Sequence, residues 1–168
     1  MSKILILGGG FGGVRAVLDL EKYFNKKGSE DLKAEITLID KNAYHLFVPA
    51  IYEVASAFDV KTDAFATDLK KTVALPYKEI FEGKNINFIQ GEVARVSLEH
   101  QLVSTTGDHV FPYDYLVLAF GSQVADFGIS GVKEYAHQFK SVEDALLVRK
   151  KIEDYFTKIS QGQITGPI

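Results

Sequence analysis

The chain contains 168 residues, with 19 Lys and Arg against 22 Asp and Glu, which gives a formal net charge of −3 at pH 7. A hydrophobic content of 46% and a charged content of 24% exclude a disordered or collagen-like chain. The mild acidity argues against nucleic acid as a partner, because phosphate binding needs a surplus of Lys and Arg on one face. The sequence has no cysteine, which excludes disulfides, zinc thiolate sites and iron–sulfur ligation by its own residues.

The first elements form a pattern of strand, helix and strand. Residues 3–7, KILIL, are a continuous apolar run that stops at Gly8, as is typical of a central strand in a parallel sheet. Apolar residues then recur at helical spacing from Val14 to Phe24. Residues 35–40, EITLID, predict a second buried strand. Together these segments predict a βαβ unit with a right-handed crossover.

The rest of the chain continues with short elements. We expect short helices over 62–72 and 77–82, a third strand over 85–90 and another apolar strand over 115–119. Alternating apolar residues between 92 and 112 predict an antiparallel hairpin or meander. Ser141 followed by Asp144 resembles a helix N-cap with an acidic residue three positions on, and predicts a helix to about Ser160.

These elements predict an α/β fold: a Rossmann-like parallel sheet with helices on both faces plus a small antiparallel β-meander. We expect residues 1–160 to form one domain and residues 161–168 to form a tail. The apolar runs fall well below the roughly 18 residues of a membrane-spanning helix, and none has the form of a signal peptide. We therefore expect a cytoplasmic protein.

A glycine-rich segment follows the first predicted strand. Residues 8–13, GGGFGG, place the spacing G-x-G-x-x-G on Gly8, Gly10 and Gly13. In a dinucleotide-binding turn these glycines allow the tight turn, the close approach of a pyrophosphate and close packing of helix on sheet. The helix start would also offer backbone N–H groups and a positive dipole end to the phosphates. The alternative is a packing loop that binds no nucleotide.

Asp40 closes the second predicted strand, where an acidic side chain can accept both ribose hydroxyls of an adenosine. The spacing from Gly13 exceeds the usual one of about 20 residues, so the intervening helix and loop must be long. An acidic residue here favours FAD or NAD over NADP, because it would repel a 2′-phosphate. The alternative for Asp40 is a solvated strand-end or capping carboxylate.

Residues 113–122, YDYLVLAFGS, are not needed by a simple NAD-dependent dehydrogenase. They resemble a strand in the FAD domain of flavoprotein reductases with two dinucleotide-binding domains. The glycine turn, residues 44–55, YHLFVPAIYEVA, and residues 137–152 are similar to segments of the type II NADH:quinone dehydrogenases within that group. The resemblance extends over nearly all of residues 2–160. It identifies the chain as similar to the N-terminal FAD-domain segment of such a protein.

The resemblance implies that FAD is the cofactor and that NADH and a quinone are substrates of the full-length protein. It assigns cofactor binding to Gly8, Gly10, Phe11, Gly12, Gly13, Asp40, Lys41, Asn42, His45, Val93, Ala119 and Gly121. It assigns no catalytic residue, because the flavin ring performs hydride transfer and the protein orients it. Phe120 departs from the pattern, since the family usually has Thr at this position. The four histidines have no metal-ligand spacing, so we expect no metal site.

The resemblance also implies parts that this chain does not contain. No second G-x-G-x-x-G follows Gly13. The family's NADH domain, its later strand with a Gly-Asp pair and its C-terminal membrane-binding region would all lie beyond Ile168. We therefore expect the parallel sheet to lack a strand and to leave an unpaired edge that favours a homodimer. Contact with a membrane would be peripheral.

Four other functions remain as alternatives. A sulfide:quinone reductase and a disulfide reductase would use cysteines, and the sequence has none. A plain NAD-dependent dehydrogenase would lack residues 113–122 and would need a substrate domain. A nucleotide-binding module without turnover would keep the phosphate turn but hold no reducible flavin. A yellow preparation would favour the enzyme, and a colourless one would favour the module.

Overall fold

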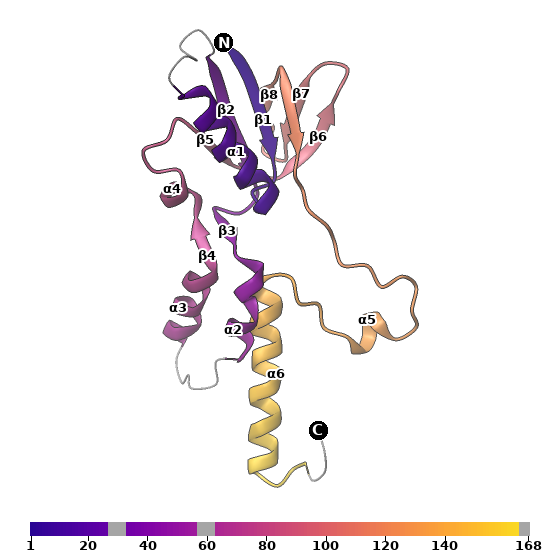
Figure 1. Cartoon of the computed structure of the whole chain (residues 1–168). Coiled ribbons are helices and arrows are strands. Elements are labelled where there is room, and N and C mark those ends of the chain that lie inside the picture. The colour runs from indigo at the N-terminus through magenta and orange to yellow at the C-terminus, as the bar shows by residue number, and fades with distance from the viewer. Residues whose placement is uncertain (27–32, 57–62, 165–168) are drawn as a thin grey trace. The chain divides into compact units, whose positions relative to one another are not determined.

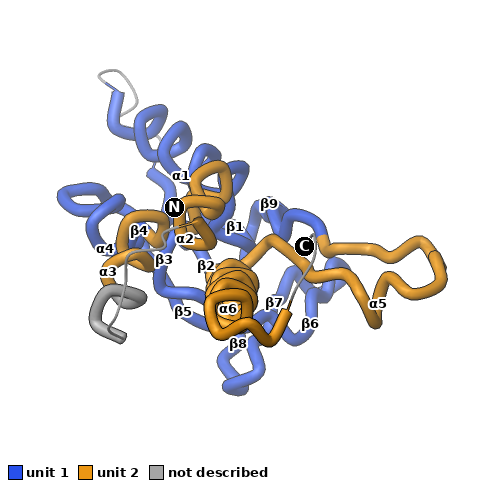
Figure 2. The backbone as a smooth tube through the Cα atoms, turned by 90° about the horizontal axis from the view of Figure 1, so that it is seen from below, with its two compact units in different colours: residues 1–45, 75–122 blue, residues 46–74, 123–168 orange. Residues whose placement is uncertain are grey.

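The computed structural model describes residues 1–26, 33–56 and 63–164 (Figure 1). The chain forms two compact units (Figure 2). Unit 1 comprises Met1–His45 and Leu75–Ser122, and unit 2 comprises Leu46–Ala74 and Gln123–Ile168. The predicted domain boundary at residue 160 stays a prediction.

Unit 1 is built on a parallel sheet of four strands. They are β1 (Ser2–Leu7), β2 (Ala34–Asp40), β5 (Asn87–Gln90) and β9 (Tyr115–Leu118), in the spatial order β5-β2-β1-β9. All three neighbouring pairs are parallel, and Ser2 to Leu7 pair in unbroken register with Ala34 to Ile39. The strands predicted over 3–7, 35–40, 85–90 and 115–119 therefore form the predicted parallel sheet.

The two faces of this sheet are covered differently. Ile4 and Ile6 pack with helix α1 (Phe11–Phe24) and with Tyr77 of the short helix α4 (Tyr77–Ile80). Leu5 and Leu7 pack on the other face against the antiparallel strands β6 (Val93–Ser97), β7 (Leu102–Thr105) and β8 (Val110–Pro112). The apolar run of β1 is continuous because both faces of this strand are buried. The α/β fold with a meander is confirmed, and in the described part of unit 1 the meander occupies the face opposite α1.

Two short strands mark where the chain passes between the units. β3 (Tyr44–Leu46) and β4 (Ala74–Pro76) form a separate two-stranded sheet. Neither strand is predicted from the sequence, because three residues are too few to show an alternating pattern. Their pairing brings the start of α4 beside the end of β2, and the Tyr77 N–H donates to the Ala43 carbonyl at 3.1 Å.

Unit 2 is helical in its described residues. It contains a 3₁₀ turn (Val48–Ala50), α2 (Ile51–Ser56), α3 (Asp63–Val73), α5 (Val132–Tyr135) and α6 (Val142–Ser160). A buried cluster joins α2, the end of α3 and α6 through Ile51, Val54, Ala55, Val73, Val142 and Ala145. The helix predicted over 62–72 corresponds to α3, except that Thr62 lies outside the described residues. In the part of the chain that the structure describes, every helix is too short or too polar to cross a membrane.

Helix α6 begins with the predicted capping box. The Ser141 hydroxyl accepts from the Asp144 N–H at 3.0 Å, and the Asp144 carboxylate accepts from the Ser141 N–H at 2.8 Å. Burial raises the pKa of the Asp144 carboxyl, but hydrogen bonds from Lys140 and Ser141 outweigh it and hold that pKa below its usual value. The box satisfies backbone donors that the first turn of a helix leaves open.

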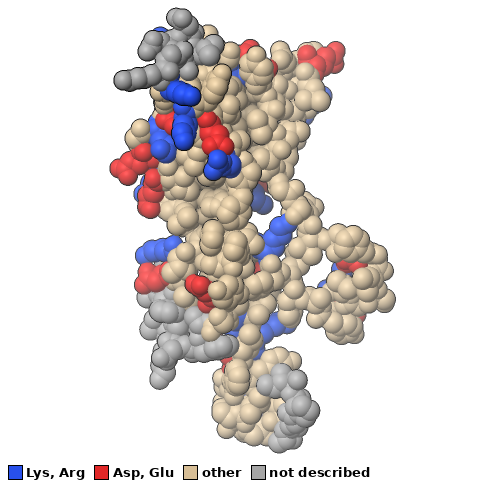
Figure 3. Space-filling model, viewed as in Figure 1, with Lys and Arg blue, Asp and Glu red and all other residues tan. Residues whose placement is uncertain are grey.

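Charges of both signs lie next to one another over α1 in the space-filling view (Figure 3). Arg15 and Asp19 form an ion pair across one turn of this helix, at 2.7 Å, and both side chains are more than half exposed. Exposed pairs of this kind contribute at most about 0.5 kcal/mol to the free energy of unfolding.

Candidate functional site

The predicted site residues gather at the carboxyl ends of the parallel strands in unit 1. Gly8 follows β1, Asp40 closes β2, and Ala119 follows β9. The sheet order changes direction here, since β2 and β5 extend from one side of β1 and β9 lies on the other. Ligands of open α/β sheets bind at such a switch point, outside the carboxyl ends of the strands.

Two of the motif glycines are required by the protein's own packing. Gly8 has a φ of +99°, and a Cβ there would overlap the carbonyl oxygen of Ala119. A Cβ at Gly13 would overlap the carbonyl oxygen of Gly8. Both obstacles are backbone atoms, which have no rotamer to change. Gly8 and Gly13 therefore close the turn tightly between β1, β9 and the first turn of α1.

Gly10 and Gly12 are glycines for a different reason. A Cβ at either position would meet no atom within 4 Å. Gly10 is the N-cap of α1, it contributes no side-chain cap, and the first turn holds no acidic residue. The backbone N–H groups and the positive dipole end of a 14-residue helix thus border open space. This surface fits the phosphates of a dinucleotide, which bind where a backbone can be approached closely.

Asp40 ties the end of β2 to the glycine turn. One carboxylate oxygen accepts from the Gly9 N–H at 2.6 Å, and the other accepts from the Asn42 N–H at 2.7 Å. The side chain is only partly buried, and each carboxylate oxygen has a second lone pair. The carboxylate can therefore accept ribose hydroxyls while it holds the turn. Lys41 and Asn42 follow directly at this edge.

Two buried side chains hold the Gly9 carbonyl. The Tyr77 hydroxyl donates to it at 2.7 Å, and His45 Nδ1 lies 2.9 Å from it. His45 also meets the half-exposed Phe11 ring edge-on, with centroids 4.8 Å apart. Burial, with the charge of Asp40 and the neighbouring Tyr44, raises the pKa of the Tyr77 hydroxyl well above its usual value. Tyr77 thus stays protonated and remains a donor.

Tyr77 and Gly9 were not among the predicted site residues. Gly9 lacks room for a side chain because a Cβ would overlap the Tyr77 ring and hydroxyl. The sign of this contact in the sequence is Gly9 itself, an extra glycine beside the motif. Nothing in the sequence near Tyr77 connects it to residue 9, because the contact depends on how β3 and β4 pair.

The remaining predicted residues lie around the same edge. Val93 is the first residue of β6. Two residues before it, the Gly91 N–H donates to the Asp40 carbonyl at 2.9 Å, which holds the start of β6 near the end of β2. The Ala119 N–H donates to the Leu7 carbonyl at 2.8 Å, which holds the end of β9 against β1. Gly121 has a φ of +76° and open space around it. Phe120 is 58% exposed.

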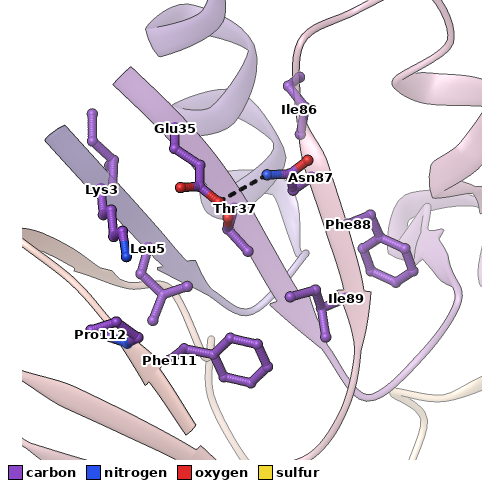
Figure 4. Close-up of a pocket in the computed structure, with 11 residues that line it drawn as sticks. Lys3, Leu5, Glu35, Thr37, Ile86, Asn87, Phe88, Ile89, Phe111 and Pro112 are labelled. Atoms are coloured by element: carbon purple, nitrogen blue, oxygen red, sulfur yellow. Dashed lines mark hydrogen bonds between the residues drawn. The ribbon is translucent and has the colours of Figure 1, made fainter. Parts of the chain in front are cut away.

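A cavity of about 500 Å³ lies elsewhere in unit 1 (Figure 4). It lies between the sheet and β8, and Lys3, Glu35 and Asn87 border it at the amino ends of β1, β2 and β5. Asn87 Nδ2 donates to Glu35 Oε1 at 3.3 Å across its rim. The cavity is therefore at the opposite end of the strands from the glycine turn, and we assign it no part in dinucleotide binding.

The fold and the glycine turn define a protein of the dinucleotide-binding class. Residues 2–160 match the family described as pyridine nucleotide-disulphide oxidoreductase, and the chain belongs to that family. The type II NADH:quinone oxidoreductase of Staphylococcus haemolyticus is 30% identical over 161 residues, which cover 96% of this chain and 36% of the relative. The chain thus spans about a third of the length of the curated relatives it matches.

Solved structures agree with this fold. The structure of Plasmodium falciparum NDH2 in complex with NADH superposes with a TM-score of 0.72 at 27% identity, covering 98% of this chain and 31% of that one. The sulfide:quinone oxidoreductase of Aquifex aeolicus superposes with a TM-score of 0.71 at 24% identity, covering 94% and 33%. At that identity the second likeness shows the fold alone.

Proposed function

We propose that this chain is the FAD-binding part of a flavin-dependent oxidoreductase that passes electrons from NADH to a quinone. The family of residues 2–160 and the activity of the Staphylococcus haemolyticus relative support the proposal. Bound FAD would supply the hydride acceptor, and the chain's residues would bind and orient it. The proposed location is the cytoplasm, with peripheral contact to a membrane, since quinones dissolve in membranes.

The observation that supports cofactor binding best is the open face of the glycine turn. Gly8 and Gly13 are explained by the protein's own packing, but Gly10 and Gly12 are not. A site for a pyrophosphate explains why residues 10 and 12 have no side chain. In this proposal the N–H groups at the start of α1 bind the phosphates, and Asp40 accepts the hydroxyls of the adenosine ribose.

We expect the protein to bind FAD more tightly than FMN. FMN lacks the adenosine that Asp40 would hold, and it lacks the second phosphate that would lie on the turn. Titration calorimetry with FAD, FMN, ADP and NADPH measures this order. Binding of FAD with a dissociation constant at least tenfold below that of FMN supports the proposal. Equal binding of FAD and FMN contradicts it.

The same titration separates the enzyme from a nucleotide-binding module. A module that retains only the phosphate turn would bind ADP as tightly as FAD, because the flavin ring would make no contact. An FAD-binding domain would bind FAD more tightly than ADP and would give a yellow protein whose flavin is bleached by dithionite. ADP and FAD bound alike would favour the module.

We further propose that edge strand β9 promotes association of two copies. In the described residues β1 is its only neighbour, and Tyr115 and Leu118 are 62% and 57% exposed. No charged residue interrupts the strand, and charges are the usual protection of an edge. Leu118→Lys should therefore shift a dimer toward monomer in sedimentation velocity runs. Leu98→Lys, at a 71% exposed position after β6, is the matched control. A wild-type monomer at high concentration contradicts the proposal.

A further inference from the structure

One carbonyl oxygen in the glycine turn accepts hydrogen bonds from two buried side chains. The Tyr77 hydroxyl lies 2.7 Å and His45 Nδ1 lies 2.9 Å from the Gly9 oxygen. Tyr77 is 1% exposed and His45 is 6% exposed, so water does not compete for either bond. One hydrogen bond is enough to satisfy a buried backbone carbonyl, so the second donor is more than the carbonyl itself requires.

The chemistry of the carbonyl fixes the tautomer of His45. A carbonyl oxygen can only accept, so Nδ1 must carry a proton to make this bond. The Phe11 ring packs edge-on against His45 and keeps the imidazole in place.

The direction of the next N–H group follows from the planarity of the peptide bond. In a trans peptide the C=O and N–H point in opposite directions. The Gly9 oxygen points into the protein, toward Tyr77 and His45, so the Gly10 N–H points away from them. That side is open, since a Cβ at Gly10 would meet nothing within 4 Å. Two donors on the carbonyl also polarise the peptide and strengthen its N–H as a donor.

We propose that Tyr77 and His45 are positioning residues of the phosphate-binding turn, which aim and polarise the Gly10 N–H toward an anionic phosphate oxygen. The inference rests on the proposed FAD site and names the two residues that orient its Gly10 N–H group. Both side chains are buried, so in this proposal they act through the Gly9 peptide and not by touching the ligand. Asp40 holds the other side of the same residue through the Gly9 N–H, so Gly9 is fixed at both of its backbone polar groups.

The hydroxyl of Tyr77 can be separated from its ring. The ring stacks on Phe81 with centroids 5.7 Å apart and packs against Phe88 at 4.7 Å. Tyr77→Phe keeps these contacts and removes one donor from the Gly9 carbonyl. Tyr113→Phe is the matched control, because Tyr113 is also buried in unit 1 and donates to a backbone carbonyl, that of Ser97, at 3.3 Å.

We expect Tyr77→Phe to raise the dissociation constant for FAD about tenfold, which corresponds to about 1.4 kcal/mol. Tyr113→Phe should leave it within about twofold, although each variant loses one hydrogen bond from a tyrosine hydroxyl to a backbone carbonyl. His45→Ala should weaken FAD binding like Tyr77→Phe. His45→Asn should restore it, because the Asn amide can place a donor where Nδ1 stands.

A measurement without cofactor tests the same geometry. In the FAD-free protein, long-range ¹⁵N–¹H spectra should show the His45 ring protonated at Nδ1. The Gly10 amide ¹⁵N resonance responds to hydrogen bonding at the preceding carbonyl, so it should move in Tyr77→Phe and stay in Tyr113→Phe. A His45 ring protonated only at Nε2 would overturn the inference, even if Tyr77→Phe failed to fold.

The outcomes distinguish this inference from the proposed function. A wild-type protein that binds no FAD overturns the proposed function, and the positioning role falls with it. A wild-type protein that binds FAD, with Tyr77→Phe and His45→Ala binding it equally well, overturns the positioning role alone. Equal losses in Tyr77→Phe and Tyr113→Phe would also overturn it, because the effect would then reflect stability.

Discussion

Gly13→Ala is expected to lower the free energy of unfolding by about 3 kcal/mol, at the upper end of the usual cost of overpacking. The new Cβ would overlap the Gly8 carbonyl group, and the nearest atom beyond Gly8 would be the Ala119 Cβ at 3.5 Å. The Gly8 oxygen belongs to a backbone held by the Gly8 N–H bond to the Ile39 carbonyl at 2.8 Å. Helix α1 would have to move off the sheet. Urea unfolding followed by circular dichroism measures the loss.

Gly10→Ala is the matched control, since it adds the same methyl group three residues earlier in the motif. Its Cβ would enter open space, and its φ of −69° is one that any residue adopts. We expect the stability to change by less than about 0.5 kcal/mol. FAD binding should nevertheless weaken by at least about tenfold, or about 1.4 kcal/mol, because the methyl group occupies the proposed place of the phosphate. Unchanged FAD binding in Gly10→Ala would contradict the proposed site.

Asp40→Asn is expected to damage both the turn and the binding of FAD. The two carboxylate oxygens accept from two different donors, the Gly9 and Asn42 N–H groups. An Asn side chain has one oxygen and one amide nitrogen, so one of these N–H groups would face another donor. Loss of a charged hydrogen bond costs about 1.5 to 3 kcal/mol. We expect a loss of about 2 kcal/mol in stability and a further loss of ribose binding.

The control for charge removal is Glu35→Gln, on the same strand. Glu35 lies at the opposite end of β2 and accepts from Asn87 Nδ2 at 3.3 Å, a bond that a Gln oxygen can still accept. Stability and FAD binding should both stay near the wild-type values. Thermal unfolding and FAD titration of the two variants make the comparison. If the Asp40→Asn variant binds FAD as tightly as the Glu35→Gln variant does, Asp40 is not part of the FAD site.

The sequence predicts best where one physical pattern decides the structure alone. Residues 4–7 are apolar without alternation because β1 is buried on both faces there, and that pattern identifies a central parallel strand. The start of α6 is predicted because Ser141 and Asp144 satisfy each other's neighbouring N–H groups within one turn. The residues after each parallel strand could be grouped into one site because the strands end at the same edge.

The sequence predicts least where the structure depends on contacts between distant short segments. Strand β4 has only three residues, and its pairing with β3 is what brings Tyr77 beside Gly9. The run of three glycines at 8–10 indicates a close approach, but not which side chain makes it. The elements α2 and α5 were missed as well, since they are only six and four residues long and show too little of the helical period.

Gly9 is held by hydrogen bonds to three residues that lie far from it in the sequence: Asp40, His45 and Tyr77. A peptide that ended before residue 75 would contain the whole glycine motif and the acidic strand end, but it would lack the Tyr77 hydroxyl that donates to the Gly9 carbonyl. The conformation of the turn is therefore completed by contacts of high sequence separation. A dinucleotide that binds there would stabilise strands and helices together, so cofactor occupancy would report on the folding of unit 1 as a whole.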